Sequence, residues 1–355
     1  MCKLVTLYIG SYTRIDENGI NVWKLQRERR ESVSVDGEKE VLNPSYLTVS
    51  SDRQYLYSVM EEISYHGHSG GGIASFQWKG GQWKLVNTCG TQGTLPCHIL
   101  LDEKRNFLFT SNYMSGSISM FPVENDGSIG ELCDLKQHEG NGPNRERQEG
   151  PHVHFAGFSA DGDGIWCVDL GIDTVKYYEI DEQQACLLPV PERDIHLPKG
   201  VGPRHFVLDP MKKNIMYLVT ELSSEVFVID CQSERNIILQ RISSLPADTS
   251  ESYCAAVKIS DDGKYVYVSN RGHNSITIFE HESKKSCLVR KSTFGTGGKT
   301  PRDFAVCGSR IYVANQDSGN ITVLEMDMEQ VKLIKIEKSY KCNSPACVLA
   351  DVFPE

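Results

Sequence analysis

The sequence predicts an all-β fold: a single seven-bladed β-propeller over residues 1–355. Three observations predict it. One template of apolar runs recurs seven times, at intervals of 52, 55, 52, 52, 46 and 44 residues. The runs are rich in β-branched and aromatic residues, which favour strands. The two ends of the chain complete one copy of the template between them, which closes a ring.

The stretch Gly150–Asp173 shows the template most fully. It holds two histidines spaced by one residue, an apolar run, an Asp-Gly turn and a second apolar run that ends on a polar residue. The seven first runs begin near Pro44, Pro96, Pro151, Pro203, Ala255, Pro301 and Pro345. The second runs are Leu56–Val59, Leu108–Ser111, Ile165–Val168, Met216–Val219, Val266–Ser269 and Ile311–Ala314.

Turn signals separate the runs. Most first and second runs are linked by Ser/Asp-rich segments such as Ser159–Gly162 and Ser260–Gly263, which favour hairpin turns. Third runs such as Ser117–Phe121 follow after a short polar turn, so each unit predicts a four-stranded blade. Two segments break the period, Ser64–Gly72 and Cys133–Glu149, and are expected to be rim loops that shape a site.

The chain ends belong to one blade. Leu7–Tyr12 matches a second run and Gly19–Trp23 a third run, so the N-terminal copy lacks its first run. Pro345–Ala350 supplies that missing run from the other end of the chain. The C-terminal segment is therefore expected to form the innermost strand of the first blade, which leaves the ring without a free edge.

Composition narrows the class of protein. A net charge of −10 and a pI near 5.5 argue against nucleic acid or an anionic membrane as a partner. No apolar run approaches the roughly 20 residues of a membrane span, and no export signal is visible, so we expect a cytoplasmic protein. The twelve cysteines include no Cys-x-x-Cys spacing, which predicts free thiols in place of disulfides or a zinc site.

Charged side chains converge on one mouth of the predicted channel. Adjacent strands run antiparallel, so the start of each first run and the end of each second run meet at the same rim. This places together His152, His154, Arg204, His205, Arg302, Asp169, Glu221 and Arg271. Histidine serves as a general acid or base, and arginine stabilises an oxyanion or binds an anion. No nucleophile elbow, Walker loop or dinucleotide fingerprint is present, which favours a water nucleophile or an intramolecular addition.

Six motifs carry a family resemblance. They are Gln148–His154, Gly202–Phe206, Thr220–Ser224, Ser269–Ile276, Thr300–Phe304 and Ala314–Ser318. With these motifs the chain resembles the seven-bladed lactonase family, which includes propeller-type 6-phosphogluconolactonases and fungal 3-carboxy-cis,cis-muconate lactonizing enzymes.

The resemblance implies a catalytic set of one histidine with Arg204, Glu221 and Arg271. The histidine is His152 or His154, and similarity to the bacterial phosphogluconolactonases favours His152. No metal or other cofactor is implied. Further substrate-binding residues are expected around this set, with His98 and His205 at or next to the position of His152 in their own blades. The expected substrate-binding residues are His98, His205, Arg302, Asn315 and Gln316.

The leading hypothesis is hydrolysis of an anionic sugar lactone, with 6-phosphogluconolactone as the first choice, by a monomer or weak homo-oligomer. Water would be activated by His152, or alternatively by Glu221, while Arg204 and Arg271 hold the substrate and stabilise the oxyanion. A muconate-type cycloisomerase and a non-catalytic binding platform are the alternatives. Structural alternatives also stay open: the histidine pair could hydrogen-bond or bind a metal, and the arginines could tie blades together.

Overall fold

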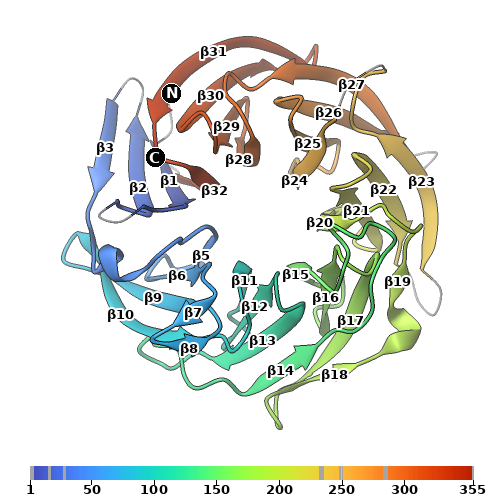
Figure 1. Cartoon of the computed structure of the whole chain (residues 1–355). Helices are drawn as coiled ribbons and strands as arrows, with labels where there is room; N and C mark the ends of the chain where they lie inside the picture. Colours follow the sequence, from blue (N-terminus) through green and yellow to red (C-terminus); the bar gives the residue numbers. More distant parts are fainter. Residues whose placement is uncertain are drawn as a thin grey trace.

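A computed structural model describes residues 4–14, 17–26, 29–231, 236–247, 249, 251–282 and 287–353 of the chain. Seven sheets stand around a central axis as the blades of a propeller, which confirms the predicted fold class (Figure 1). Within this described part, no helix is long and apolar enough to cross a membrane.

The blades are numbered along the chain, and their strands are given from the axis outwards. Blade 1 contains β32 (Pro345–Phe353), β1 (Leu4–Ser11), β2 (Ile20–Gln26) and β3 (Arg29–Val33). Blade 2 contains β5 (Leu47–Val49), β6 (Tyr55–Met60), β9 (Gly72–Lys79), β10 (Gln82–Gly90) and the short β4 (Val35–Asp36). Blade 3 contains β11 (Pro96–Asp102), β12 (Phe107–Asn112), β13 (Ser117–Pro122) and β14 (Asp134–Gln137). Blade 4 contains β15 (Val153–Phe158), β16 (Gly164–Asp169), β17 (Thr174–Asp181), β18 (Cys186–Pro189) and β19 (Ile195–His196).

The remaining blades have four strands each. Blade 5 contains β20 (Pro203–Leu208), β21 (Ile215–Thr220), β22 (Glu225–Asp230) and β23 (Ile237–Ser243). Blade 6 contains β24 (Tyr253–Ile259), β25 (Tyr265–Arg271), β26 (Ser275–Glu282) and β27 (Cys287–Gly295). Blade 7 contains β28 (Pro301–Cys307), β29 (Arg310–Asn315), β30 (Asn320–Asp327) and β31 (Lys332–Lys341). A hairpin of β7 (Ser64–Tyr65) and β8 (His68–Ser69) and two 3-10 turns, η1 (Glu38–Glu40) and η2 (Pro191–Arg193), lie outside the blades.

The ring closes as predicted from the chain ends. β1 pairs antiparallel with β32 over its whole length, with Tyr8 opposite Leu349, so the C-terminal strand is the innermost strand of blade 1. The side chain of Arg53, from the turn after β5, forms an ion pair with Asp351 of β32. The first and last parts of the chain are thus held together by a strand ladder that only the closed ring can form.

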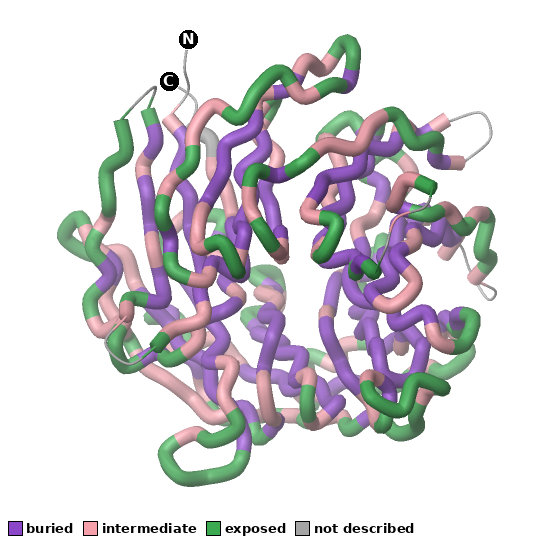
Figure 2. Tube along the Cα trace, turned by 45° about the horizontal axis from the view of Figure 1, so that its top comes forward, coloured by how far each residue is buried: buried purple, intermediate pink, exposed green. Residues whose placement is uncertain are grey.

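The apolar core lies between the blades. Seven clusters of buried residues occupy the seven seams; Trp166 and Tyr177 of blade 4, for example, share one cluster with Phe206 and Met216 of blade 5. Second strands such as β12 are buried at every position because blades cover both of their faces. Burial of each large apolar side chain contributes about 1.5–3 kcal/mol, so the seams hold the ring together. Figure 2 shows buried residues concentrated in the inner strands and exposed ones in the outer strands and loops.

The predicted Ser/Asp turns form hairpins with one recurring hydrogen bond. The Ser159 hydroxyl donates to Asp161 at 2.5 Å, and the Ser260 hydroxyl donates to Asp262 at 2.6 Å. Gly162 has a φ of 73°, a conformation that glycine adopts without strain. The described cysteines are also as predicted: all eleven are free thiols, and five of them are buried.

A β-bulge recurs where the innermost strands begin. In blade 5, Pro203 pairs with Thr220 and His205 with Val219, which leaves Arg204 as the extra residue. Proline can begin these strands because a first residue need not donate to the ladder. Bulges re-aim side chains at barrel and sheet ends, and here they direct residues toward the axis. The extra residues in the six bulged blades are Ala346, Cys97, His154, Arg204, Ala255 and Arg302.

The predicted rim loop Cys133–Glu149 is in part a strand, because Asp134–Gln137 forms β14 at the outer edge of blade 3; the rest of it, between β14 and β15, reaches over blade 4 to blade 5. In Figure 1 this green segment passes over the ends of β16, β17, β20 and β21. The Gln148 side chain anchors it through hydrogen bonds to the Leu170 carbonyl at 2.9 Å and to Asp173 at 2.8 Å. The loop therefore forms part of the wall of the channel mouth.

Candidate active site

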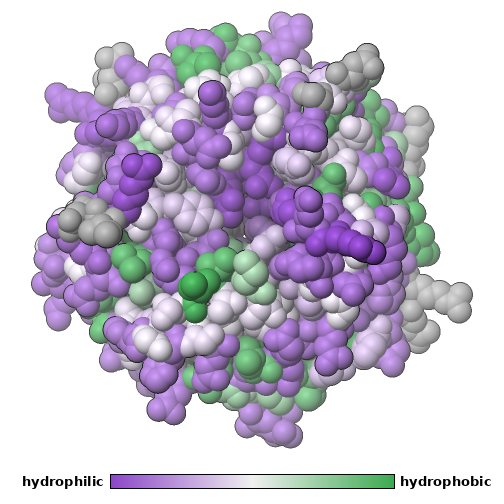
Figure 3. All heavy atoms as spheres, in the orientation of Figure 1, coloured by the Kyte–Doolittle hydropathy of each residue, from purple (hydrophilic) through white to green (hydrophobic). Residues whose placement is uncertain are grey.

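The mouth of the channel is built from two rings of side chains. The rim ring consists of the residues that end or directly follow the second strands: Tyr12, Glu61, Tyr113, Leu170, Glu221, Arg271 and Gln316. The inner ring lies one step nearer the axis, where the innermost strands start: Ser45, Cys97, His154, Arg204, Ala255, Arg302 and Ala346. Figure 3 shows this face hollowed at its centre, with hydrophilic residues around most of the hollow.

A narrow cavity lies inside the two rings. Its lining consists of Ser45, Tyr46, Cys97, His154, Arg204, His205, Arg302, Asp303 and Ala346. Six of these nine are inner-ring residues, so the bulges supply most of the cavity wall. Two arginines and two histidines in one small cavity form a basic site within an acidic protein.

Glu221 is the anchor of the arginine cluster. Its side chain is buried, and its carboxylate contacts Arg204 Nε at 2.9 Å, Arg271 Nη2 at 2.7 Å and Arg147 Nη2 at 2.5 Å. Burial alone would raise the pKa of Glu221, but the surrounding arginines outweigh it and hold the pKa well below its ordinary value. Glu221 is therefore a carboxylate that fixes three guanidinium groups and is a weak base.

The predicted arginines also tie blades together. Arg204 Nη1 donates to the Ala255 carbonyl of blade 6 at 2.6 Å, and Arg271 of blade 6 reaches blade 5 through Glu221. The hydrogen bond from Arg271 Nη2 to the Cys254 carbonyl, at 3.2 Å, stays within blade 6. Arg204 is buried and lines the cavity, whereas the Arg271 side chain is 16% exposed at the rim. The structural and the functional interpretation of these arginines are thus compatible, because the same contacts that join the blades fix the cations around the cavity.

The two candidate histidines lie in different surroundings. His152 precedes β15; its ring stacks on Tyr113, its Nδ1 lies 3.0 Å from the Tyr113 carbonyl and its Nε2 lies 3.3 Å from Glu149. His154 is the bulge residue of β15 and lines the cavity, and its buried Nδ1 has no hydrogen-bond partner among the described residues. Burial and the nearby Arg204 hold the pKa of His154 well below its ordinary value, so its ring is neutral.

Two buried histidines form the floor beneath the cavity: His205 lines the cavity, whereas His98 packs behind His205 and does not line it. Both stack against Phe155, with ring centroids 4.2 and 4.8 Å apart, and both are buried. The expectation that they lie at or next to the position of His152 in their blades was wrong, because the strand register makes both equivalent to Phe155. The repeat alignment set the start of blade 4 two residues too early. Burial lowers the pKa of His98 to about 3, so this floor carries no charge at neutral pH.

The three expected binding residues of blade 7 lie at different depths. Arg302 lines the cavity, and Gln316 lies on the rim ring with its Oε1 3.5 Å from Arg302 Nη1. Asn315 is buried within the blade, where its side-chain amide donates to the Thr322 hydroxyl at 3.1 Å. The equivalent Asn270 makes the same kind of bond to Thr277. Asn315 therefore belongs to a repeated contact inside the blades and does not line the cavity.

A second carboxylate lies at the mouth on blade 2. The hydroxyl of Tyr12 donates to both Glu61 oxygens, each at 2.9 Å, and the Ser45 hydroxyl donates to Glu61 Oε2. Burial raises the pKa of Glu61, although Arg302 and the hydroxyl donors oppose the shift. Sequence reasoning missed this group, yet Tyr12 and Glu61 follow second runs in the same way as Glu221 does, so the repeat alignment held the signal.

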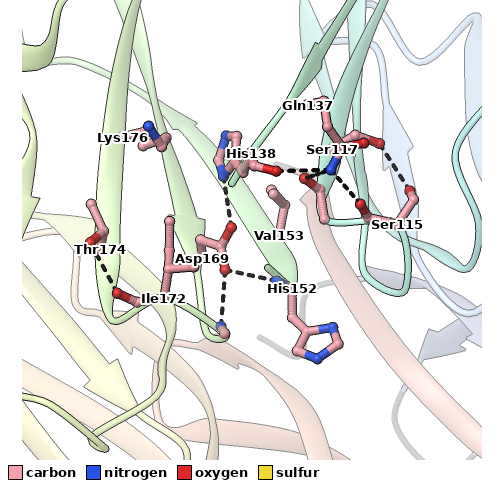
Figure 4. A network of polar contacts seen from close by, with 12 residues as sticks. Ser115, Ser117, Gln137, His138, His152, Val153, Asp169, Ile172, Thr174 and Lys176 are labelled. Carbon is pink, nitrogen blue, oxygen red and sulfur yellow. Dashed lines mark hydrogen bonds and ion pairs between the residues drawn. The ribbon is translucent and has the colours of Figure 1, made fainter. Parts of the chain in front are cut away.

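Asp169 was expected at the mouth, but it lies one residue short of the rim ring and is fully buried. Its Oδ1 accepts hydrogen bonds from the backbone N–H groups of His152 at 2.7 Å and Gly171 at 2.9 Å. Its Oδ2 lies 2.7 Å from Nδ1 of His138 (Figure 4). Asp169 therefore fixes the backbone immediately before His154 and does not face the cavity.

Arg147 and Tyr113 were not among the expected site residues. Arg147 comes from the loop that crosses the mouth, and it contacts Glu221 and the Tyr113 hydroxyl, the latter at 3.4 Å. Its side chain is 36% exposed, so it reaches from solvent into the arginine cluster. The sequence predicted that this loop shapes the site. No sequence pattern within the polar insertion, however, distinguishes Arg147 from the nearby Arg145.

Comparisons with known proteins agree with this fold. A family model described as lactonase, 7-bladed beta-propeller, matches residues 6–350. The 6-phosphogluconolactonase of Bacillus subtilis is 32% identical over 349 residues, covering 96% of this chain and 97% of that protein. The 6-phosphogluconolactonase of Formosa agariphila is 31% identical over 346 residues, covering 95% and 97%. The solved periplasmic gluconolactonase of Pseudomonas aeruginosa superposes with a TM-score of 0.89 at 28% identity, covering 99% of this chain and 100% of that chain.

Proposed function

Because the chain belongs to the family of seven-bladed β-propeller lactonases, we propose that it hydrolyses a sugar lactone, with 6-phosphogluconolactone as the substrate. One observation carries the proposal: a neutral histidine and two arginines line a single cavity, beside a carboxylate that holds three arginines in place. Ester hydrolysis needs a base for water and positive charge for the oxyanion, and this cavity offers both.

His154 is the proposed general base. Its ring lines the cavity with an unpartnered buried nitrogen, whereas both ring nitrogens of His152 face protein oxygens. The arginines that depress the pKa of His154 are the groups that bind an anionic substrate. A bound anion offsets their charge, which raises the pKa of His154 and makes it a stronger base when substrate is present.

The arginines divide into two groups by depth. Arg204 and Arg302 line the cavity and are the proposed donors to the carbonyl oxygen as it becomes negative. Arg147 and Arg271 lie at the rim, where they are partly exposed, and are the proposed contacts for the phosphate group. Glu221, with a pKa held well below its ordinary value, keeps these guanidinium groups in place and is not the base.

The activity test uses freshly prepared 6-phosphogluconolactone and unphosphorylated gluconolactone, each corrected for spontaneous hydrolysis. We expect enzymatic hydrolysis, with a higher kcat/KM for the phosphorylated lactone. Arg147→Ala should raise KM for the phosphorylated substrate selectively, because it removes one charged contact at the rim. Arg145→Ala, an exposed residue of the same loop, is the matched control and should behave as wild type.

Two results would count against this proposal. Rates equal to the spontaneous rates on both lactones would remove the hydrolase assignment. A loss of the ultraviolet absorbance of the conjugated diene on addition of a carboxymuconate, without lactone hydrolysis, would indicate that the same arginines serve a cycloisomerase.

A further inference from the structure

We propose that Ser45 and Glu61 form the acid side of the site: Ser45 gives a proton to the departing ring oxygen, and Glu61 supplies Ser45 with its replacement. This inference rests on the proposed lactone hydrolysis. It assigns the second half of the reaction to a group of residues separate from His154, Arg204 and Glu221.

Ser45 connects Glu61 to the cavity. The Ser45 side chain is buried, lines the same cavity as His154, and donates its hydrogen bond to Glu61 Oε2. Glu61 itself lies one ring further out, on the rim. A proton that starts on Glu61 therefore has a single hydroxyl between it and the space where the lactone binds.

The two carboxylates of the mouth have opposite surroundings. Among the described residues, Glu221 of blade 5 contacts three arginines and no hydroxyl group, whereas Glu61 of blade 2 accepts hydrogen bonds from Tyr12 and Ser45. The cation with the largest effect on Glu61 is Arg302, whose guanidinium lies over the Tyr12 ring, 5.3 Å from its centroid. Burial raises the pKa of Glu61 while the arginines lower that of Glu221, so Glu61 is the better suited of the two to hold a proton.

The proton transfers balance. Water loses a proton to His154 as its oxygen bonds to the lactone carbon, and the negative charge passes to the carbonyl oxygen. The ring carbon–oxygen bond then breaks. The Ser45 hydroxyl, which donates to Glu61 before the reaction, turns its proton to the ring oxygen, and Ser45 Oγ takes the proton that Glu61 carries. Glu61 is left as a carboxylate beside Arg302, and His154 as a cation. Exchange of one proton with solvent at each group restores the site, and the product is the hydroxy acid.

The test compares two leaving groups of the same shape. 6-Phosphogluconolactone expels an alkoxide, which needs an acid, whereas its ring-sulfur analogue expels a thiolate, which leaves without one. Glu61→Gln keeps the size of the side chain but has no proton to give. We expect it to lower kcat for the lactone by roughly 10²-fold or more, as loss of a general acid does, with a far smaller loss for the thiolactone. Ser45→Ala should reproduce this pattern.

The control is Glu62→Gln, the same substitution at the next residue, whose carboxylate accepts a hydrogen bond from Asn43 at 2.6 Å and does not contact Ser45. It should leave both rates unchanged. Equal losses of kcat on lactone and thiolactone in Glu61→Gln and in Ser45→Ala would overturn the acid role and indicate a structural one. Wild-type protein that opens neither substrate would instead remove the proposed lactone hydrolysis itself.

Discussion

Removal of the charge of Glu221 should destabilise the protein. Glu221→Gln preserves the shape of the side chain, but it leaves Arg147, Arg204 and Arg271 together at a buried point without a counter-charge. Breaking a buried ion pair by removing one partner costs about 3–5 kcal/mol. An unfolding entropy of about 2.1 cal/mol/K per residue gives about 0.75 kcal/mol/K for 355 residues. The expected loss is therefore about 4–7 °C in Tm.

The pH dependence of this loss has a definite sign. The pKa of Glu221 is lower in the folded than in the unfolded protein, so its contribution is complete above the ordinary glutamate range. It is lost as the pH falls below that range toward the folded value. The Tm difference between wild type and Glu221→Gln, followed by circular dichroism, should therefore be large near neutral pH and should narrow in acid.

The matched control is Glu225→Gln. Glu225 lies four residues further along and pairs with one arginine, Arg241, whose side chain is 48% exposed. Such surface pairs contribute about 0–1 kcal/mol, so this variant should melt near wild type. If Glu221→Gln melted no lower than Glu225→Gln, or if its deficit did not change with pH, the arginine cluster would not depend on Glu221 in the way described.

Three further outcomes are expected. Asp169→Asn should lower both Tm and kcat, because it weakens the contact with His138 and the hydrogen bond that holds the backbone before His154. Unchanged kinetics would show that Asp169 does not position the site. The kcat/KM profile for an uncharged lactone should lack an acid limb near pH 6.5, since the pKa of His154 in the free protein lies well below its ordinary value of about 6.5; a limb at that pH would contradict a buried neutral base. Dithiothreitol should leave Tm unchanged, because the eleven described cysteines are free thiols, and a reductant-dependent fall would contradict this.

The fold could be predicted from the sequence because each blade repeats the same pattern of buried strands and turns. A second strand such as Phe107–Asn112 is buried throughout, since neighbouring blades cover both faces, and its period and turns are visible in the chain. Ring closure followed from the unmatched run at Pro345. These features are local or repetitive, so one sequence was sufficient to find them.

The site could be predicted less completely, because it depends on bulges and on a loop. The alternation rule that places His152 and His154 on one face does not hold where a bulge inserts an extra residue, as it does at His154. Arg147 reaches Glu221 from a loop whose path is fixed by Gln148 and Asp173, and no periodic signal describes that path. The repeat alignment could have identified Glu61, since Glu61 follows its second strand as Glu221 does.

The central claim is that His154, the cavity-lining histidine, activates water for lactone hydrolysis. The most direct test is the kcat of His154→Gln and His152→Gln on freshly prepared 6-phosphogluconolactone, measured on variants with wild-type circular dichroism spectra. His154→Gln should lose roughly 10²–10⁴-fold, as expected for removal of a general base, while His152→Gln should lose far less. A large loss in His152→Gln with His154→Gln still active would contradict this assignment of the base.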